Sequence, residues 1–291
     1  MSCQKFGSTN GRPRPRRATG GPVGGQHLGL RFDLLGDEHA AHRAQQRVAV
    51  EELEVARELF DAKDYAKAVD VADIVLSRRP AVDVDKQRTA WTVIANSQFE
   101  LAQFDKAEGA YLQVQTLLPA SDAQRGPIEE RLAASIYKQA EAQRTAGDDA
   151  GAVEDFLRVA KVAPSAKIRA TADYDAAALL IGLKDWSRAI EVLEGFRRNF
   201  PNSELQPEVT RKLAVAYSEA DRPAVAAVEF ERIASASGTA PDLQRQALAQ
   251  AAVLYEKAGD VAHTTSTLET YLKRYPQPFD AAVETRQKLA D

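Results

Sequence analysis

The sequence has few of the residues that build disulfide-bonded, zinc-binding or all-β proteins. Cys3 is the only cysteine among 291 residues, which excludes an internal disulfide and a zinc site made of cysteines. Aromatic residues make up 7% of the chain, and alternating runs of β-branched residues are scarce, so an all-β fold is not expected. The longest apolar run, around residues 176–183, is far shorter than the ~20 residues that a membrane-spanning helix needs.

Catalytic and phosphate-binding motifs are also missing. The sequence contains no GxSxG, HExxH, GxGxxG or Walker motif, the patterns typical of hydrolases, metalloproteases and nucleotide-binding proteins. His39 and His42 lie three residues apart beside acidic residues and could hold a metal on one helix face, but no motif supplies a third ligand. We therefore expect no enzyme, no cofactor and no metal site. A metal-assisted hydrolase that uses His39 and His42 is kept as an alternative.

Charge is distributed unevenly along the chain. Residues 1–32 hold six basic and no acidic residues, whereas the remainder holds 32 basic and 42 acidic ones. An acidic body disfavours general nucleic-acid binding, because such binding needs Lys and Arg to displace the counterions of phosphates. The start of the chain is also rich in Gly and Pro and cannot bury enough apolar surface to offset the entropy of ordering. We predict a disordered Gly/Pro/Arg-rich leader over residues 1–36.

Alanine, by contrast, is abundant and recurs in register. The chain holds 52 alanines, and six short loop sequences divide it at intervals of 37 to 45 residues. A small residue follows each loop, at Ala68, Ala107, Ala152, Ala189, Ala226 and Thr264. Another alanine lies twelve residues before each of these, at Ala56, Ala95, Ala140, Ala177, Ala214 and Ala252. A helix-ending residue lies twelve residues after each, at Pro80, Pro119, Pro164, Pro201, Gly238 and Pro276.

This register predicts stacked pairs of antiparallel helices. An alanine from each helix at the crossing point lets the two axes approach to about 8–10 Å, and the proline ends the second helix. One pair cannot cover its own apolar face, so neighbouring pairs must stack. The pattern resembles the tetratricopeptide repeat (TPR) family. The resemblance implies an all-α protein, an α-solenoid of about six TPR units over residues 37–276 in a right-handed superhelix. Residues 277–291 then start a seventh repeat or form a capping helix.

The resemblance also implies where a partner binds. In TPR arrays the first helix of each pair lines the concave face, and residues beside its small residue point into the groove. The candidate groove residues in this sequence are Asn96, Tyr137, Lys138, Tyr174 and Arg211. Tyrosines would supply contact area, and Asn and Arg would fix the backbone of a bound peptide or helix. Some family members hold a C-terminal carboxylate with a Lys/Asn clamp; Asn96 fits that clamp, but Thr92 stands where its lysine should be.

Two junctions between repeats suggest a subfamily. Phe200-Pro201-Asn202-Ser203 and Tyr275-Pro276-Gln277-Pro278 are similar to junctions in bacterial envelope TPR proteins, of the outer-membrane assembly lipoprotein and Tol–Pal-associated types. The resemblance implies an adaptor that binds a partner protein within a cell-envelope assembly and has no integral membrane segment. It places the full-length protein in the periplasm or at the outer membrane, although this chain shows no signal peptide. The alternatives are a cytoplasmic location, a fragment of a larger TPR protein without independent activity, and an RNA-binding helical-repeat protein.

Overall fold

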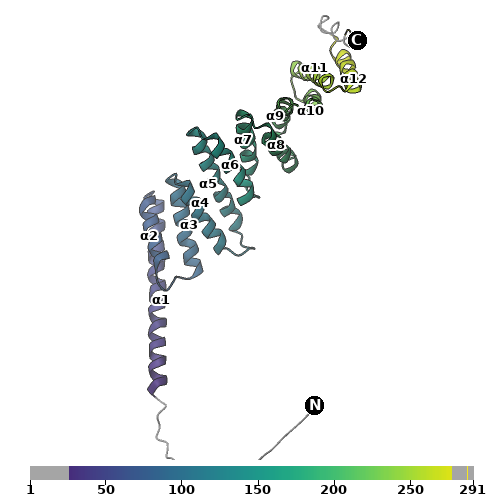
Figure 1. The fold of residues 1–291 in the computed structure, drawn as a ribbon. Helices are drawn as coiled ribbons and strands as arrows, with labels where there is room; N and C mark the ends of the chain where they lie inside the picture. The colour runs from purple at the N-terminus through teal and green to yellow at the C-terminus, as the bar shows by residue number, and fades with distance from the viewer. Residues whose placement is uncertain (1–25, 277–286, 288–291) are drawn as a thin grey trace, which may run out of the picture. The chain divides into compact units, whose positions relative to one another are not determined.

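The structure is a computed structural model that describes residues 26–276 and residue 287. The described residues form twelve α-helices and no strand (Figure 1). In chain order the helices are α1 (Gln26–Asp61), α2 (Tyr65–Ser77), α3 (Val84–Glu100), α4 (Phe104–Leu117), α5 (Arg125–Thr145), α6 (Asp149–Val162), α7 (Arg169–Gly182), α8 (Trp186–Asn199), α9 (Gln206–Glu219), α10 (Pro223–Ser235), α11 (Pro241–Lys257) and α12 (Val261–Arg274).

The chain divides into two units, residues 1–49 and residues 50–291. In the first unit α1 begins at Gln26, which is before the end of the predicted leader at residue 36. The sequence is compatible with this early start, because no proline lies between Pro22 and Pro80 and leucines recur between Leu28 and Leu35. The rest of the predicted leader, residues 1–25, lies outside the described residues. The predicted seventh repeat, residues 277–291, also lies outside them except for Gln287.

The second unit is the helical-repeat solenoid that the sequence predicts. Each helix from α2 to α12 packs against the next one along the chain, as expected for stacked antiparallel pairs. The first helices of the pairs are α1, α3, α5, α7, α9 and α11, and the second helices are α2, α4, α6, α8, α10 and α12. The short loops that separate the two helices of a pair fall where the sequence predicts them.

Each loop within a pair turns through one residue with a left-handed backbone. These residues lie five positions before the small residue of the second helix, at Lys63, Ala102, Gly147, Lys184, Asp221 and Gly259. Such a residue ends an α-helix, and glycine adopts the conformation with the least strain. The next residue is the N-cap of the second helix, and the side chains of Asp148, Asp185 and Asp260 each accept a hydrogen bond there from a backbone N–H. In the second pair this left-handed residue is Ala102, directly before Gln103, the N-cap of α4.

The recurring alanines lie at the helix contacts. All six alanines of the first helices are buried, as are the five alanines of the second helices. Thr264, the exception in the sequence, is only half-buried. Large side chains such as Phe156, Leu193 and Phe196 are fully buried one or two turns after the small residues. The alanine seams therefore set the distance between helices, and the larger side chains fill the space between neighbouring pairs.

Ion pairs join second helices of successive repeats. Arg197 on α8 donates two hydrogen bonds to the Glu229 carboxylate on α10, at 2.9 and 2.6 Å, and the Glu229 side chain is only 3% exposed. Arg158 on α6 contacts Glu108 on α4 in the same bidentate way, at 2.8 and 3.1 Å. Bidentate guanidinium–carboxylate pairs constrain orientation as well as distance, so they fix how one repeat sits on the next.

Candidate functional site

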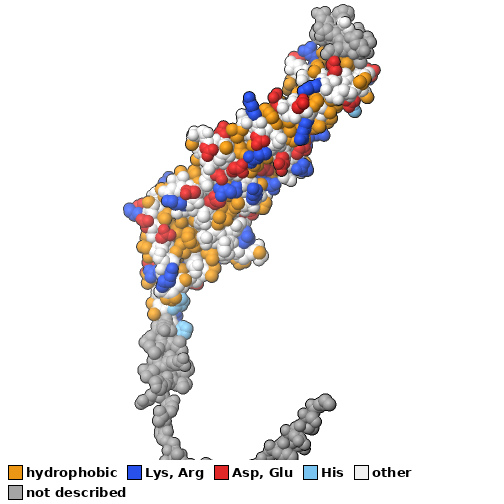
Figure 2. Space-filling view, in the orientation of Figure 1, with side chains coloured by type: hydrophobic (Ala, Val, Ile, Leu, Met, Phe, Trp, Pro, Cys, Tyr) orange, Lys and Arg blue, Asp and Glu red, His pale blue; other side chains and the backbone are white. Residues whose placement is uncertain are grey.

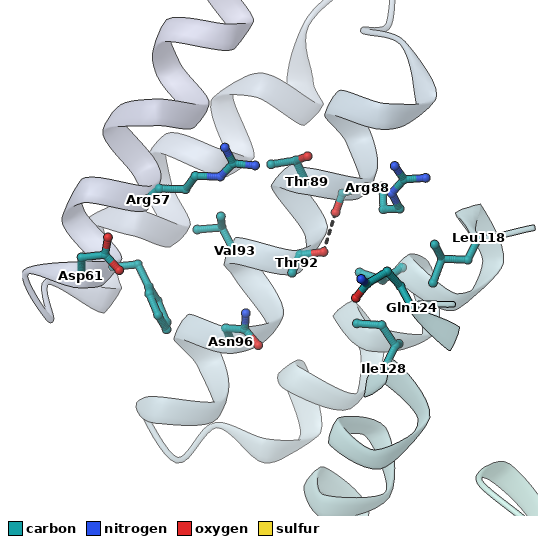
Figure 3. Close-up of a pocket in the computed structure, with 12 residues that line it drawn as sticks. Arg57, Asp61, Arg88, Thr89, Thr92, Val93, Asn96, Leu118, Gln124 and Ile128 are labelled. Atoms are coloured by element: carbon teal, nitrogen blue, oxygen red, sulfur yellow. Dashed lines mark hydrogen bonds between the residues drawn. The ribbon is translucent and has the colours of Figure 1, made fainter. Parts of the chain in front are cut away.

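Two pockets open on the face lined by the first helices, which we call the first-helix face. The N-terminal pocket has a volume of about 370 Å³ and is lined by residues of α1, α3, α4 and α5, together with Leu118 and Gln124 (Figure 3). Its floor is apolar, because the side chains of Val93, Val114, Leu118 and Ile128 are buried there. Its rim is polar and consists of Arg57, Asp61, Arg88, Thr89, Thr92, Asn96 and Gln124.

Hydrogen bonds hold the α3 side of the N-terminal pocket in place. The Thr92 hydroxyl donates to the Arg88 carbonyl at 2.8 Å (Figure 3). The Asn96 Oδ1 atom accepts a 2.6 Å hydrogen bond from the Tyr111 hydroxyl, which comes from the core side of α4. Burial raises the pKa of Tyr111 to about 12, so this hydroxyl stays protonated and keeps donating. The bond fixes the orientation of the Asn96 amide and leaves its N–H groups for a ligand, as no described residue accepts from them.

The rim of the N-terminal pocket carries more positive than negative side chains, two arginines and one aspartate. The Arg57 guanidinium extends from α1 toward Thr89 on α3 and forms no ion pair with any described residue (Figure 3). Arg88 pairs with Asp85 at 2.9 Å, and the Asp85 side chain is 82% exposed, so solvent weakens that pair. Asp61 also lines the pocket, without an ion pair to Arg57 in the described structure. A ligand therefore meets two guanidinium groups, of which one is unpaired, and one carboxylate.

In the middle of the first-helix face, the predicted tyrosines connect neighbouring repeats. The Tyr137 hydroxyl on α5 donates to the Asp175 carboxylate on α7 at 2.6 Å. The Lys212 Nζ atom on α9 lies 5.2 Å from the centre of the Tyr174 ring on α7, a cation–π distance. Burial is the main reason that the pKa values of both tyrosines are raised. These two side chains line neither pocket described here, and their contacts tie α5, α7 and α9 together.

Lys138, the fifth predicted residue, is exposed on α5 and pairs with Glu141 at 2.6 Å within the same helix. The structure thus brings Asn96 into the N-terminal pocket but does not bring the five predicted residues into one site. Residue spacing identifies the face on which a side chain lies, and it does not identify a contact across 38 residues of sequence, such as Tyr137 with Asp175.

The C-terminal pocket has a volume of about 380 Å³ and is lined by residues of α9, α10 and α11. Val215, Phe230, Ile233 and Leu243 give it an apolar surface, and Val215 is 46% exposed. Its polar residues are Arg211, Gln246 and Gln250. The Arg211 guanidinium already pairs with Glu208 one turn earlier on α9. This pocket therefore presents apolar surface and neutral amides, with a cation whose charge is compensated.

Several lining residues were not predicted from the sequence. Arg88, Thr89 and Gln246 lie six or seven positions before the small residue of their helix, one turn before the positions that the TPR resemblance marks. Helical periodicity could have found them, because residues three or four apart share a face. Gln124 precedes α5 in the longest interval between repeats, where no periodic signal exists.

The described residues contain no group of three His, Cys, Asp or Glu side chains placed to hold a metal ion. His42 lies 3.4 Å from the Gln46 amide nitrogen within α1. No helix in the described part of the chain is long and apolar enough to cross a bilayer. The two pockets combine apolar and polar lining residues on a helical face, a combination that suits binding of another chain.

Comparison with known families gives a match to the tetratricopeptide repeat over residues 134–166 and 171–203. These segments cover most of the pair α5–α6 and the pair α7–α8, so the resemblance seen in the alanine register is confirmed for these repeats. Tetratricopeptide repeats generally serve as non-catalytic scaffolds for protein contacts. Among curated proteins, no match to this sequence was found.

Several solved structures match this chain at low sequence identity and low TM-score. A chain in the structure of Naa15/Naa10 bound to HypK-THB is 16% identical with a TM-score of 0.44, and the match covers 83% of this chain and 34% of that one. PilW, described as a widely conserved type IV pilus biogenesis factor, is 17% identical with a TM-score of 0.35, and the match covers 84% of this chain and 99% of PilW. PilF of Pseudomonas aeruginosa is 14% identical with a TM-score of 0.31, and the match covers 84% of this chain and 99% of PilF.

Proposed function

We propose that this protein is an adaptor that holds a peptide or helix of a partner protein on its first-helix face. The observation that carries the proposal is the pair of pockets on that face, one near each end of the array. Each combines an apolar surface with a few polar groups, the combination by which grooves bind peptide side chains and orient the peptide backbone.

The contacts between the two pockets favour a preformed surface over a flexible one. Tyr137, Asp175, Tyr174 and Lys212 link three successive first helices by side-chain contacts. A partner segment would then bind to a face that is already ordered, so less binding free energy is spent on ordering the receptor. On the face of the described array that Figure 2 shows, charged side chains of both signs are interspersed and form no extended cationic patch of the kind that nucleic acid requires.

We further propose that the adaptor works within a bacterial cell-envelope assembly, in the periplasm or at the outer membrane. The junctions at Phe200–Ser203 and Tyr275–Pro278 support this, since they are similar to junctions of bacterial envelope TPR proteins. Fractionation of cells that express the natural gene tests the location. Recovery in the periplasmic or outer-membrane fraction supports the proposal, and recovery only in the cytoplasmic fraction contradicts it.

Peptides selected from a random phage-displayed library provide the test of the binding face. Thr89→Trp fills the N-terminal pocket and Val215→Asp places a charge in the C-terminal pocket, while Ile74→Trp and Val225→Asp make the same kinds of change at exposed positions on second helices. We expect binding of the selected peptides to fall at least about tenfold in one of the first two variants, a loss of about 1.4 kcal/mol. The matched second-helix variants should bind normally. Equal binding by all four variants would contradict the proposal.

A further inference from the structure

We infer that the N-terminal pocket is a subsite for a peptide segment in which an acidic side chain lies next to an aliphatic one. This inference rests on the proposed function, because it names the chemistry of the partner that the first-helix face binds. It concerns this pocket only, and the C-terminal pocket serves as an internal comparison.

The floor of the N-terminal pocket favours an aliphatic side chain. Val93, Val114, Leu118 and Ile128 are each buried where they meet the pocket, and Phe60 adds an aromatic wall from α1. The volume of about 370 Å³ lies at the lower end of the range of ligand sites, about 300–1,000 Å³. The pocket therefore has room for a few side chains of an extended peptide, and burial of an aliphatic one there removes apolar surface from water on both partners.

The rim of the pocket favours an acidic side chain beside that anchor. The Arg57 guanidinium points across the pocket toward Thr89 and has no ion pair with a described residue (Figure 3). Arg88 keeps N–H donors beyond those used by the exposed Asp85. The third charged group, Asp61, lies behind Arg57 on α1, and the Arg57 side chain extends away from it (Figure 3). A carboxylate beside Thr89 would gain charge-assisted hydrogen bonds without displacing an existing partner of Arg57.

The C-terminal pocket has the same size but lacks this preference. Its arginine, Arg211, already pairs with Glu208, and its other polar residues are the neutral Gln246 and Gln250. An acidic peptide residue would have to compete with Glu208 for Arg211. The two pockets therefore differ in the charge that they select, and Arg211 provides a matched control for Arg57.

The test starts from phage-displayed random peptides selected on the whole protein, and then uses one selected peptide made synthetically in three forms. The first form is the selected sequence, the second replaces its Asp and Glu by Asn and Gln, and the third has an amidated C-terminus. Binding of each form is measured by fluorescence anisotropy to the wild-type protein, to Arg57→Gln and to Arg211→Gln. Circular dichroism and a denaturation curve establish that the variants are folded.

We expect selected peptides to be enriched in an acidic residue next to an aliphatic one. The Asn/Gln form should bind about tenfold more weakly than the acidic form to the wild-type protein and to Arg211→Gln. This difference should vanish in Arg57→Gln, and the amidated form should bind as the acidic form does. The inference is overturned if acidic residues are not enriched, if Arg57→Gln keeps the discrimination, or if only the terminal carboxylate matters. If binding of the selected peptides is weakened by Val215→Asp alone, the inference about the N-terminal pocket is overturned while the proposed function stands. If no peptide binds the first-helix face, both are overturned.

Discussion

Replacement of Ala177 by leucine tests the alanine seam most directly in the centre of the array. Ala177 lies on α7, is fully buried, and contacts a core cluster that includes Ile190 and Leu193 of α8 and Leu213 of α9. A leucine adds three carbon atoms to a position that has no access to solvent. The neighbouring residue, Ala178, is half-buried on the same helix, and the same substitution there has space on its exposed side.

The expected cost follows from the packing of the seam. Extra methylene groups in a closely packed core cost about 1–3 kcal/mol, because side chains leave their rotamers and the helices separate. We expect this loss of unfolding free energy for Ala177→Leu. For Ala178→Leu we expect a change within about 0.5 kcal/mol, as is usual for surface substitutions. Both variants make the same substitution, so the difference between their unfolding free energies reports the effect of the position alone.

Urea denaturation followed by circular dichroism measures the effect, and hydrogen exchange of the α7 and α8 amides locates it. Each repeat contacts only its neighbours, so exchange should accelerate most in α7, α8 and α9. If the two leucine variants unfold at the same urea concentration as each other, the alanines do not set the distance between helices. Equal acceleration of exchange along the whole array would also contradict local packing at this seam.

Three further predictions concern the ion pair, a buried acid and a loop. Glu229→Ala should lower the unfolding free energy by about 3 kcal/mol, the lower end of the range for a broken buried pair, because it leaves the partly buried Arg197 with only the longer 3.5 Å contact to Glu194, whereas the double variant Arg197→Met/Glu229→Leu should lie closer to the wild type in a denaturation series. Burial raises the pKa of Asp173 to about 6 from an ordinary 3.8, so between pH 4 and 6 the folded state binds more protons than the unfolded state and stability falls as the pH rises. Asp173→Asn should therefore gain stability relative to the wild type between pH 4 and pH 7, by at most about 3 kcal/mol, and an unchanged difference at the two pH values would refute this origin. Gly147→Ala should cost about 1 kcal/mol because its φ of +84° strains a side-chain-bearing residue, while Gly182→Ala, at the end of α7 with open space around it, should be neutral or stabilising; thermal unfolding of both variants checks the opposite signs.

The repeat architecture could be predicted from the sequence because each recurring small residue marks a place where two helices must cross closely. An alanine at a crossing point, a loop that ends a helix and a proline that cannot continue one each have a local physical cause. The buried Ala95 and Ala214 follow that prediction, whereas Thr264, which breaks the alanine register, is only half-buried. The prediction is less precise at the ends of helices. α1 begins at Gln26, inside the segment predicted as leader, and the left-handed residue of the second loop is Ala102.

The face that we propose for binding could be predicted only in part. The positions next to the small residues do lie on the first-helix face, and Asn96 and Arg211 line its two pockets. Periodicity could not show that Tyr137 bonds to Asp175 in the next repeat, or that Tyr174 lies under Lys212. These contacts depend on how far one pair is rotated against the next, and that rotation is a property of the packed array.

Photo-crosslinking to a selected peptide tests the proposed binding face most directly. A photoreactive phenylalanine analogue is placed in turn at Thr92, at Gln250 and at Ile74, of which the first two line the pockets and the third is exposed on α2. We predict crosslinks from Thr92 or Gln250 and none from Ile74. Crosslinks from Ile74 alone would place the peptide on the second helices and contradict the account.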